Sequence, residues 1–166
     1  MLMNAFDVLL SDSRTQLDAF VEDYRRALEA TLDGLTEQQA RRRLVPSSTT
    51  LLGLLKHVTW MQRIWFEVCI GGKPRRELGP VQSPEESFRL DDDDTIAGVV
   101  AAHRRACDTA RGIVADLPLD AVVTGHRAGP RTVHWVYLQV LRELAHHCGH
   151  ADILREQILA GRDERV

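Results

Sequence analysis

Four segments of this chain repeat apolar residues every three or four positions, and no other pattern in the sequence constrains the fold as strongly. The repeats run from Asp12 to Gly34, from Thr49 to Ile70, from Asp93 to Asp116, and from Thr132 to Leu159. This period places the apolar side chains on one face of a helix, and that face must be buried against another element. No pair of strand-like runs competes with the four repeats. The sequence therefore predicts an all-α protein, an antiparallel four-helix bundle with long crossing connections.

The length and composition of the chain fit one soluble domain. Its 166 residues are 44% hydrophobic and 27% charged, which is ordinary for a globular protein, and we expect residues 1–166 to form a single domain. The formal net charge of −3 argues against nucleic acid as a partner, because nucleic-acid binding depends on an excess of basic groups. No apolar run reaches the roughly 18 residues of a membrane span, so we expect no membrane partner.

The cysteines and the first residues predict a cytoplasmic protein. Cys69, Cys107 and Cys148 lie inside apolar helical repeats and form no CxxC pair, which is typical of reduced thiols. The first ten residues carry no basic residue ahead of their apolar stretch, so no secretory signal is predicted. Cys148 lies between histidines and is either a low-pKa thiolate or a small buried helix residue. We favour the second interpretation.

The last helical repeat contains the densest group of residue types that bind metals. Glu143, His146, His147 and His150 fall within about two helical turns. Glu143 and His147 lie within roughly 50° of the centre of the apolar stripe and, being four residues apart, share one face. His150 lies near the border of the stripe, and His146 lies about 110° away from its centre. We therefore expect Glu143 and His147 at a buried site and His146 at the surface.

A histidine of the second repeat completes a candidate metal site. His57 falls on the apolar stripe in line with Leu54 and Met61, and a polar ring on a core face needs a partner. His57, Glu143 and His147 would present N, O and N ligands from two helices. Three such ligands leave at least one coordination position open, which is typical of a reactive divalent site. Zinc, nickel, iron and manganese are all chemically admissible.

These residues also have ordinary structural interpretations. A carbonyl or hydroxyl group would satisfy His57 in the core, and a nearby arginine would pair with Glu143. His150 is a reserve ligand, a donor to another ligand or a substrate contact, and we assign it a catalytic role. Aromatic residues near the site are more often core than pocket, but we predict that Trp60 and Trp135 line a cleft and bind the substrate.

Two stretches of the sequence resemble a DinB-like family of bacterial proteins. They are Pro46 to Val58 followed by Trp65-Phe66, and Arg131 to Val136 leading into Glu143-x-x-x-His147-x-Gly149-His150-x-Asp152-x-Leu154-Arg155-Glu156. Membership of the wider DinB and YfiT superfamily implies a four-helix bundle and a divalent metal. One histidine of the second helix and two residues four apart on the last helix bind this metal, and His57, Glu143 and His147 match these positions. The related mycothiol-dependent maleylpyruvate isomerases have a glutamate at the first position on the last helix.

The resemblance also predicts an activity. It implies a divalent-metal-dependent enzyme, a low-molecular-weight-thiol S-transferase or isomerase, with mycothiol or another thiol as cosubstrate and a small molecule as substrate. The chain departs from the close family at three positions near the ligands. The family commonly has a histidine at Gln139, an acid at Arg142 and an arginine at His146. These departures alter the polarity of the site but leave the three ligand positions matched.

A different interpretation is a non-catalytic helical binding or dimerisation protein with a vestigial metal site. A large exposed apolar stripe on the first or third long helix would favour it, because such a stripe forms a homodimer without metal. Thermal stability independent of metal, together with inactivity toward thiols and electrophiles, would distinguish this protein from the enzyme.

Overall fold

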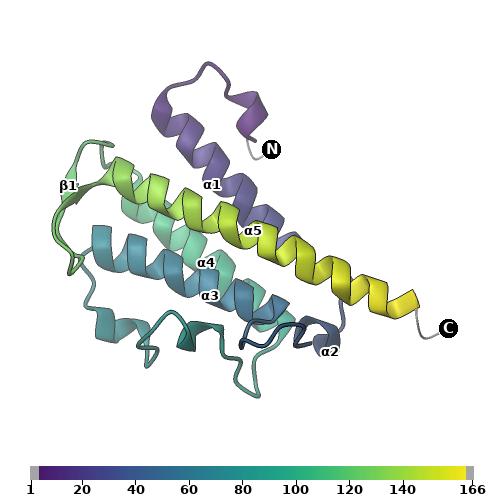
Figure 1. Ribbon diagram of the computed structural model, residues 1–166. Coiled ribbons are helices and arrows are strands. Elements are labelled where there is room, and N and C mark those ends of the chain that lie inside the picture. Colours follow the sequence, from purple (N-terminus) through teal and green to yellow (C-terminus); the bar gives the residue numbers. More distant parts are fainter. Residues whose placement is uncertain (1–3, 164–166) are drawn as a thin grey trace.

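The computed structural model describes residues 4–163 and is built mostly from helices (Figure 1). Within that range the long helices are α1 (Ser13–Ala30), α3 (Leu51–Arg63), α4 (Ile96–Val114) and α5 (Val133–Asp163). A π-helix, η2 (Ile64–Ile70), continues α3. The short elements are η1 (Ala5–Asp7), α2 (Glu37–Ala40), η3 (Arg75–Leu78), η4 (Glu86–Phe88), β1 (Val122–Val123) and β2 (Arg131–Thr132). The predicted all-α class is confirmed.

The start of α4 differs from the prediction. The sequence predicts a helical segment from Asp93, but α4 begins at Ile96, and Thr95 caps it by accepting a hydrogen bond from the backbone N–H of Gly98 at 3.0 Å. Asp91 and Asp94 instead bind the Lys56 ammonium group of α3 at 2.9 and 2.6 Å. The acids therefore attach the start of α4 to α3, because a cation on a neighbouring helix is a stronger partner than the helix terminus.

Contacts between pairs of residues show whether neighbouring helices run parallel or antiparallel. The helices α1 and α5 run parallel, because Asp18 contacts Tyr137 and, further along both helices, Thr31 contacts Arg155. The helices α3 and α4 also run parallel, because Lys56 contacts Asp94, just before α4, and Thr59 contacts His103. The helix α5 runs antiparallel to α3 and its continuation η2, because His57 contacts His147 and Phe66 contacts Tyr137. The helices α1 and α4 are antiparallel as well, because Glu22 contacts Arg111 and Glu29 contacts Arg104. The predicted antiparallel order is therefore wrong for two of these four helix pairs. A long crossing connection, residues 71–95, carries the chain back to the end where α3 begins, so α4 runs parallel to α3.

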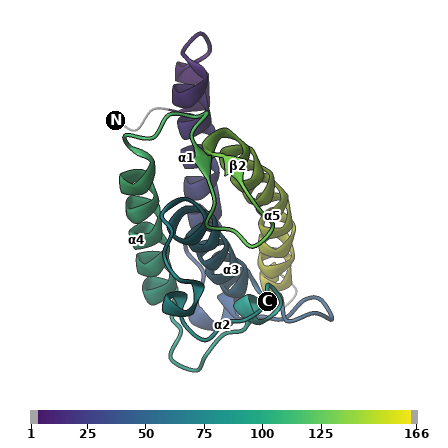
Figure 2. The ribbon, with the colours of Figure 1, turned by 90° about the vertical axis from the view of Figure 1, so that its left-hand side faces the viewer.

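The helix α3 lies between α4 and α5 (Figure 2). Leu52 and Val58 are fully buried there, and one apolar cluster joins side chains of α1, α3, α4 and α5. Any polar residue on the inner faces of α3 is consequently held inside the core. The apolar faces serve this internal packing, and within residues 4–163 no helix combines the length and hydrophobicity needed to cross a bilayer.

Two connections approach the α3–η2 helix closely at glycines. A Cβ atom on Gly53 would lie 2.4 Å from the carbonyl oxygen of Phe88, and one on Gly125 would lie 2.2 Å from the carbonyl oxygen of Val68. Both distances are far inside van der Waals contact, so these approaches require glycine. The first glycine lets η4 lie against α3. The second lets the loop between the antiparallel strands β1 and β2 lie against η2.

Candidate active site

Two histidines from different helices meet in the core. His57 of α3 and His147 of α5 are 5% and 7% exposed, and their Nε2 atoms lie 3.1 Å apart. The two helices run antiparallel with their apolar stripes facing each other, which brings residues 90 positions apart in the chain to the same depth. The structure thus places side by side two residues that the sequence marks as candidate ligands.

A hydroxyl group from the long connection fixes the proton of His57. Ser87 Oγ lies 2.7 Å from His57 Nδ1 and donates its own proton to the carbonyl oxygen of Pro84 at 2.5 Å. Because that proton is used, Ser87 accepts from His57, and the imidazole proton lies on Nδ1. The lone pair of His57 is then on Nε2, directed at His147. Phe88 stacks on the ring of His57 with a centroid separation of 3.9 Å.

Glu143 lies beside the histidine pair, one helical turn before His147. Its Oε2 atom is 3.7 Å from His147 Nε2, and its Oε1 atom accepts hydrogen bonds from Gln139 (2.8 Å) and Arg142 (3.3 Å). One carboxylate oxygen is therefore held in place while the other faces the imidazoles. Across residues 4–163, no group of three or more His, Cys, Asp or Glu side chains has the geometry of a preformed metal site. Glu143 would have to move closer to the pair to complete one.

Burial keeps both imidazoles neutral. Desolvation, followed by the proximity of His147, lowers the pKa of His57 to about 3. Desolvation lowers the pKa of His147 to about 4, against the opposing effect of Glu143. At pH 7 each ring therefore has one N–H group and one lone pair. His147 Nδ1 is buried without a hydrogen-bond partner among the described residues, so His57 is the better anchored member of the pair.

A cleft of about 590 Å³ opens beside the histidine pair. This volume lies in the range of small-molecule sites. His57 and Glu143 form part of its lining, whereas the buried His147 does not. Part of the wall comes from η2, and π-helical turns are frequent at functional sites. Aromatic, basic and amide side chains face the cleft, namely Trp60, Trp65, Arg75, His126, Arg127 and Gln139.

The two tryptophans predicted to bind substrate occupy different positions. Trp60 lines the cleft, and the Arg75 guanidinium lies 5.1 Å from the centre of its ring. Trp135 is 44% exposed and lies outside the lining. Its ring packs edge-on against Trp65 at 5.6 Å, and the Arg131 guanidinium lies 4.8 Å from its centre. Trp60 thus faces the cleft directly, and Trp135 supports a residue that does.

His146, Cys148 and His150, which lie near His147 on α5, are not part of the lining of the cleft. His146 and His150 are exposed, and their ring centroids are 4.3 Å apart. The predicted surface position of His146 is confirmed. His150 lies 5.6 Å from His147, ring to ring, and its catalytic role stays a prediction. Cys148 is 7% exposed, which confirms the prediction of a small buried residue, and burial raises the pKa of its thiol to about 12.

Several residues at the site were not predicted. Ser87 and Phe88 contact His57, Gln139 holds Glu143, and His126 stacks on Trp65 at 4.9 Å between centroids. One signal was visible, because the aperiodic, proline-containing stretch from residue 73 to residue 90 is longer than most connections, and long connections are often functional. No sequence pattern indicates which of its residues contact α3.

A comparison with protein families gives a match over most of the chain. A family model described as mycothiol-S-transferase (MST) matches residues 16–160. The matched range contains nearly all of the four long helices, the long connection of residues 71–95, and every residue of the cleft and histidine pair described above. A comparison with curated proteins gives no match.

Proposed function

The chain belongs to the mycothiol-S-transferase family of the DinB/YfiT-like superfamily, and we propose that the cleft beside His57 and His147 is its active site. The family match supports thiol S-transfer, which favours the transferase over the isomerase among the two predicted activities. We propose mycothiol as the thiol cosubstrate and a small electrophilic molecule as the second substrate. In such a transfer the S–H bond of the thiol breaks, its sulfur bonds the electrophilic carbon, and the leaving group departs from that carbon as an anion, so the site must accept the thiol proton and release the anion.

We propose that His57, Glu143 and His147 hold a divalent metal ion, zinc, nickel, iron or manganese. The observation that carries this proposal is the separation of 3.1 Å between the two Nε2 atoms. Two nitrogens bound to one cation at about 2.0–2.1 Å lie about 2.9–3.4 Å from each other. The imidazoles are neutral, as ligands must be, and a carboxylate oxygen lies 3.7 Å from one of them. A bound divalent ion would lower the pKa of a thiol that coordinates it.

Neighbouring residues orient these donors. Ser87 keeps the lone pair of His57 on Nε2, Phe88 covers the imidazole face, and Gln139 holds one oxygen of Glu143. Partners of this kind fix the orientation of a ligand and typically affect metal affinity 10- to 100-fold. The proposed ligands are therefore supported by groups from α5 and from the long connection.

The walls of the cleft suit a small, polar thiol and an electrophile. Arg75 and Arg127 attract negative charge to the cleft, and Trp60 offers an apolar surface. His150 is exposed and lies one ring contact from His147. We assign it the transfer of the thiol proton to solvent.

The same proposal extends to the architecture and the compartment. We propose that α1, α3, α4 and α5 form the DinB-type four-helix bundle, with residues 1–166 as a single domain, because their side chains share one apolar cluster. Cys69, Cys107 and Cys148 are free and buried, which agrees with the reducing cytoplasm.

The alternative of a non-catalytic dimerisation protein has less support. It calls for an apolar stripe on α1 or α4, but within the described residues Phe20 is the only exposed large apolar side chain on α1, and α4 has none. A single side chain is a normal surface feature rather than an interface. A homodimer stays a prediction.

The test combines metal content with activity. Protein prepared without a histidine tag should contain about one divalent ion per chain and transfer mycothiol to a chloromethyl fluorogenic electrophile. His57→Ala and His147→Ala should both lose the metal and lower kcat/KM at least about 1000-fold, because metal catalysis supplies several kcal/mol of transition-state stabilisation.

Matched histidine variants serve as controls. His146→Ala, on the exposed side of the same helix turn, should keep both metal and activity. Full activity in chelator-treated, metal-free protein would refute the metal role. Unchanged activity in both His57→Ala and His147→Ala would refute the cleft as the active site.

A further inference from the structure

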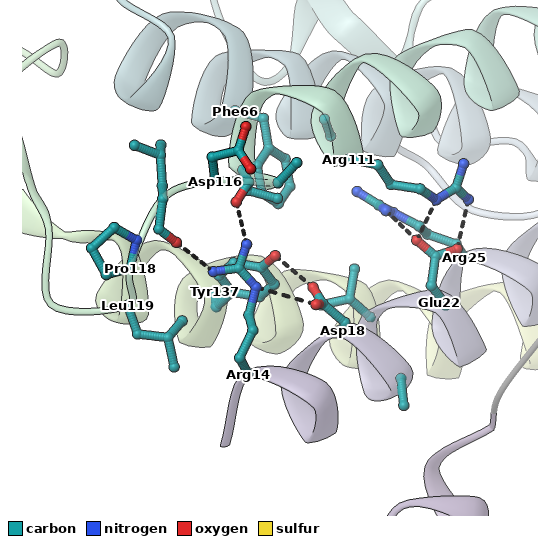
Figure 3. A pocket seen from close by; sticks show the side chains of 16 residues that line it. Arg14, Asp18, Glu22, Arg25, Phe66, Arg111, Asp116, Pro118, Leu119 and Tyr137 are labelled. Carbon is teal, nitrogen blue, oxygen red and sulfur yellow. Dashed lines mark hydrogen bonds and ion pairs between the residues drawn. The ribbon is translucent and has the colours of Figure 1, made fainter. Parts of the chain in front are cut away.

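A second cavity, of about 820 Å³, lies between α1, the end of α4 and the start of α5 (Figure 3). It shares no lining residue with the cleft beside His57. Its floor is apolar and includes Val21, Phe66, Ala110 and Val114. The volume is sufficient for a small organic molecule, and the apolar floor favours a ligand with an apolar body.

Two of the three carboxylates that line this cavity, those of Asp18 and Glu22, are already paired. Asp18 accepts from Arg14 at 3.1 Å and from the Tyr137 hydroxyl at 2.6 Å. Glu22 accepts from Arg25 at 2.6 Å and from Arg111 at 2.7 Å. Figure 3 shows these bonds along the cavity wall. A cationic ligand would have to break an existing ion pair, so the pairing disfavours cations.

Arg25 has an unused donor in the same cavity. This arginine is 5% exposed, and its guanidinium points into the cavity in Figure 3. Its Nε donates to Gln62 at 2.6 Å and its Nη1 to Glu22. Its Nη2 is buried and, among the described residues, has no hydrogen-bond partner, and the same holds for Gln62 Nε2. A buried donor left unpaired is destabilising, so the site lacks an acceptor.

We propose that this cavity binds a small apolar monocarboxylate, whose carboxylate accepts a hydrogen bond from Arg25 and whose apolar body lies on the floor formed by Val21, Phe66, Ala110 and Val114. Three arginines and two paired acids line the cavity, and a further acid, Asp116, is exposed at its rim. Arg111 and Asp116 are both exposed, whereas Arg25 is buried, and its one unpaired nitrogen, Nη2, requires a single acceptor, which matches a monoanion. Arginine donors bind carboxylates through charge-assisted hydrogen bonds, which are about twice as strong as neutral ones.

Titration calorimetry on the full-length protein tests this proposal with octanoate, 4-phenylbutyrate and 1-naphthoate. At least one of these carboxylates should bind, and its neutral alcohol analogue should bind at least about tenfold more weakly. Arg25→Gln should weaken the carboxylate at least about tenfold and leave the alcohol unchanged. Glu22 keeps its ion pair with Arg111 in this variant.

Two further variants locate the bound molecule. Ala115 is exposed and lines the cavity, so Ala115→Trp should block binding without disturbing the core, and it decides alone if Arg25→Gln does not fold. Arg127→Gln, in the cleft, should leave binding unchanged. The proposal is overturned if none of the three carboxylates binds below millimolar concentrations, if alcohols and carboxylates bind equally, or if Arg127→Gln abolishes binding while Ala115→Trp does not.

Discussion

Two buried histidines on neighbouring helices share one environment at Nδ1 and differ at Nε2. His57 on α3 and His103 on α4 are 5% and 1% exposed. A hydroxyl group holds Nδ1 in each case, Ser87 for His57 at 2.7 Å and Thr59 for His103 at 3.1 Å. Each hydroxyl gives its own proton to a backbone carbonyl. Both imidazoles therefore keep their proton on Nδ1 and their lone pair on Nε2.

The groups opposite Nε2 separate the two sites. His103 Nε2 lies 3.6 Å from the Sγ atom of Cys107, and burial raises the pKa of that thiol, so it stays protonated and can donate. His57 Nε2 instead faces His147 Nε2 at 3.1 Å, beside a cleft. The protein itself satisfies His103, whereas the lone pair of His57 is directed at a second imidazole. Burial alone thus fails to distinguish a structural histidine from a candidate ligand, and the group facing the second nitrogen does.

The prediction with the largest expected effect concerns how the free energy of unfolding depends on pH. Burial lowers the pKa of His103 from 6.5 to about 4. Between these values the unfolded chain binds a proton that the folded chain does not. The free energy of unfolding is therefore highest above about pH 6.5, and it decreases by about 3 kcal/mol in total as the pH falls toward 4. In urea unfolding experiments over this pH range, the free energy of unfolding of His103→Leu should therefore change by about 3 kcal/mol less than that of the wild type.

A surface histidine and a divalent metal serve as controls for this measurement. His146→Leu, at an exposed position, should leave the pH dependence of the wild type unchanged. Added divalent metal should stabilise the wild type and His103→Leu equally, because we assign metal binding to the other pair. Parallel pH curves for the wild type and His103→Leu would contradict a neutral, buried His103.

The local period of the sequence explains which parts of the site could be predicted. Glu143 and His147 lie four residues apart on one helix, so their common face follows from helix geometry alone. The burial of His57 follows in the same way from its place on an apolar stripe. For the histidine pair, the pattern on each helix was sufficient to identify the inward-facing residue, whereas the buried Arg25 and Gln62 were not identified.

Contacts between distant segments account for what could not be predicted. His57 and His103 occupy equivalent stripes in the sequence, and the partners that distinguish them come from other elements. Ser87 reaches His57 because Gly53 lets the connection approach α3. The parallel order of α3 and α4 likewise depends on the path of residues 71–95, and a crossing path leaves no periodic signal.

A prediction of intermediate size concerns the two hydroxyl groups, Ser87 beside His57 and Thr59 beside His103. In Ser87→Ala no hydroxyl group holds the proton of His57 on Nδ1, so metal affinity and kcat/KM should fall about 10- to 100-fold. Thr59→Val, the matched change beside His103, should leave metal affinity and activity unchanged and cost about 1 kcal/mol of unfolding free energy. Metal titration with a competing chelator and mycothiol transfer assays measure the two outcomes. A loss of metal affinity in Thr59→Val as large as that in Ser87→Ala would mean that the two histidines do not differ in function.

The smallest expected effect concerns the side chains that hold Glu143. Gln139→Ala removes a hydrogen bond of 2.8 Å to its Oε1 atom, and we expect metal affinity to fall about fivefold, since such a bond contributes about 1 kcal/mol. Arg142 is 71% exposed and 3.3 Å from the same oxygen, so Arg142→Ala should change affinity less than twofold. If both variants lose affinity equally, and the loss disappears at high salt, the charge around the carboxylate matters rather than its orientation. If only Gln139→Ala loses affinity, at every salt concentration, the free oxygen of Glu143 depends on the bond that holds the other one, just as Nε2 of His57 depends on the hydroxyl at Nδ1.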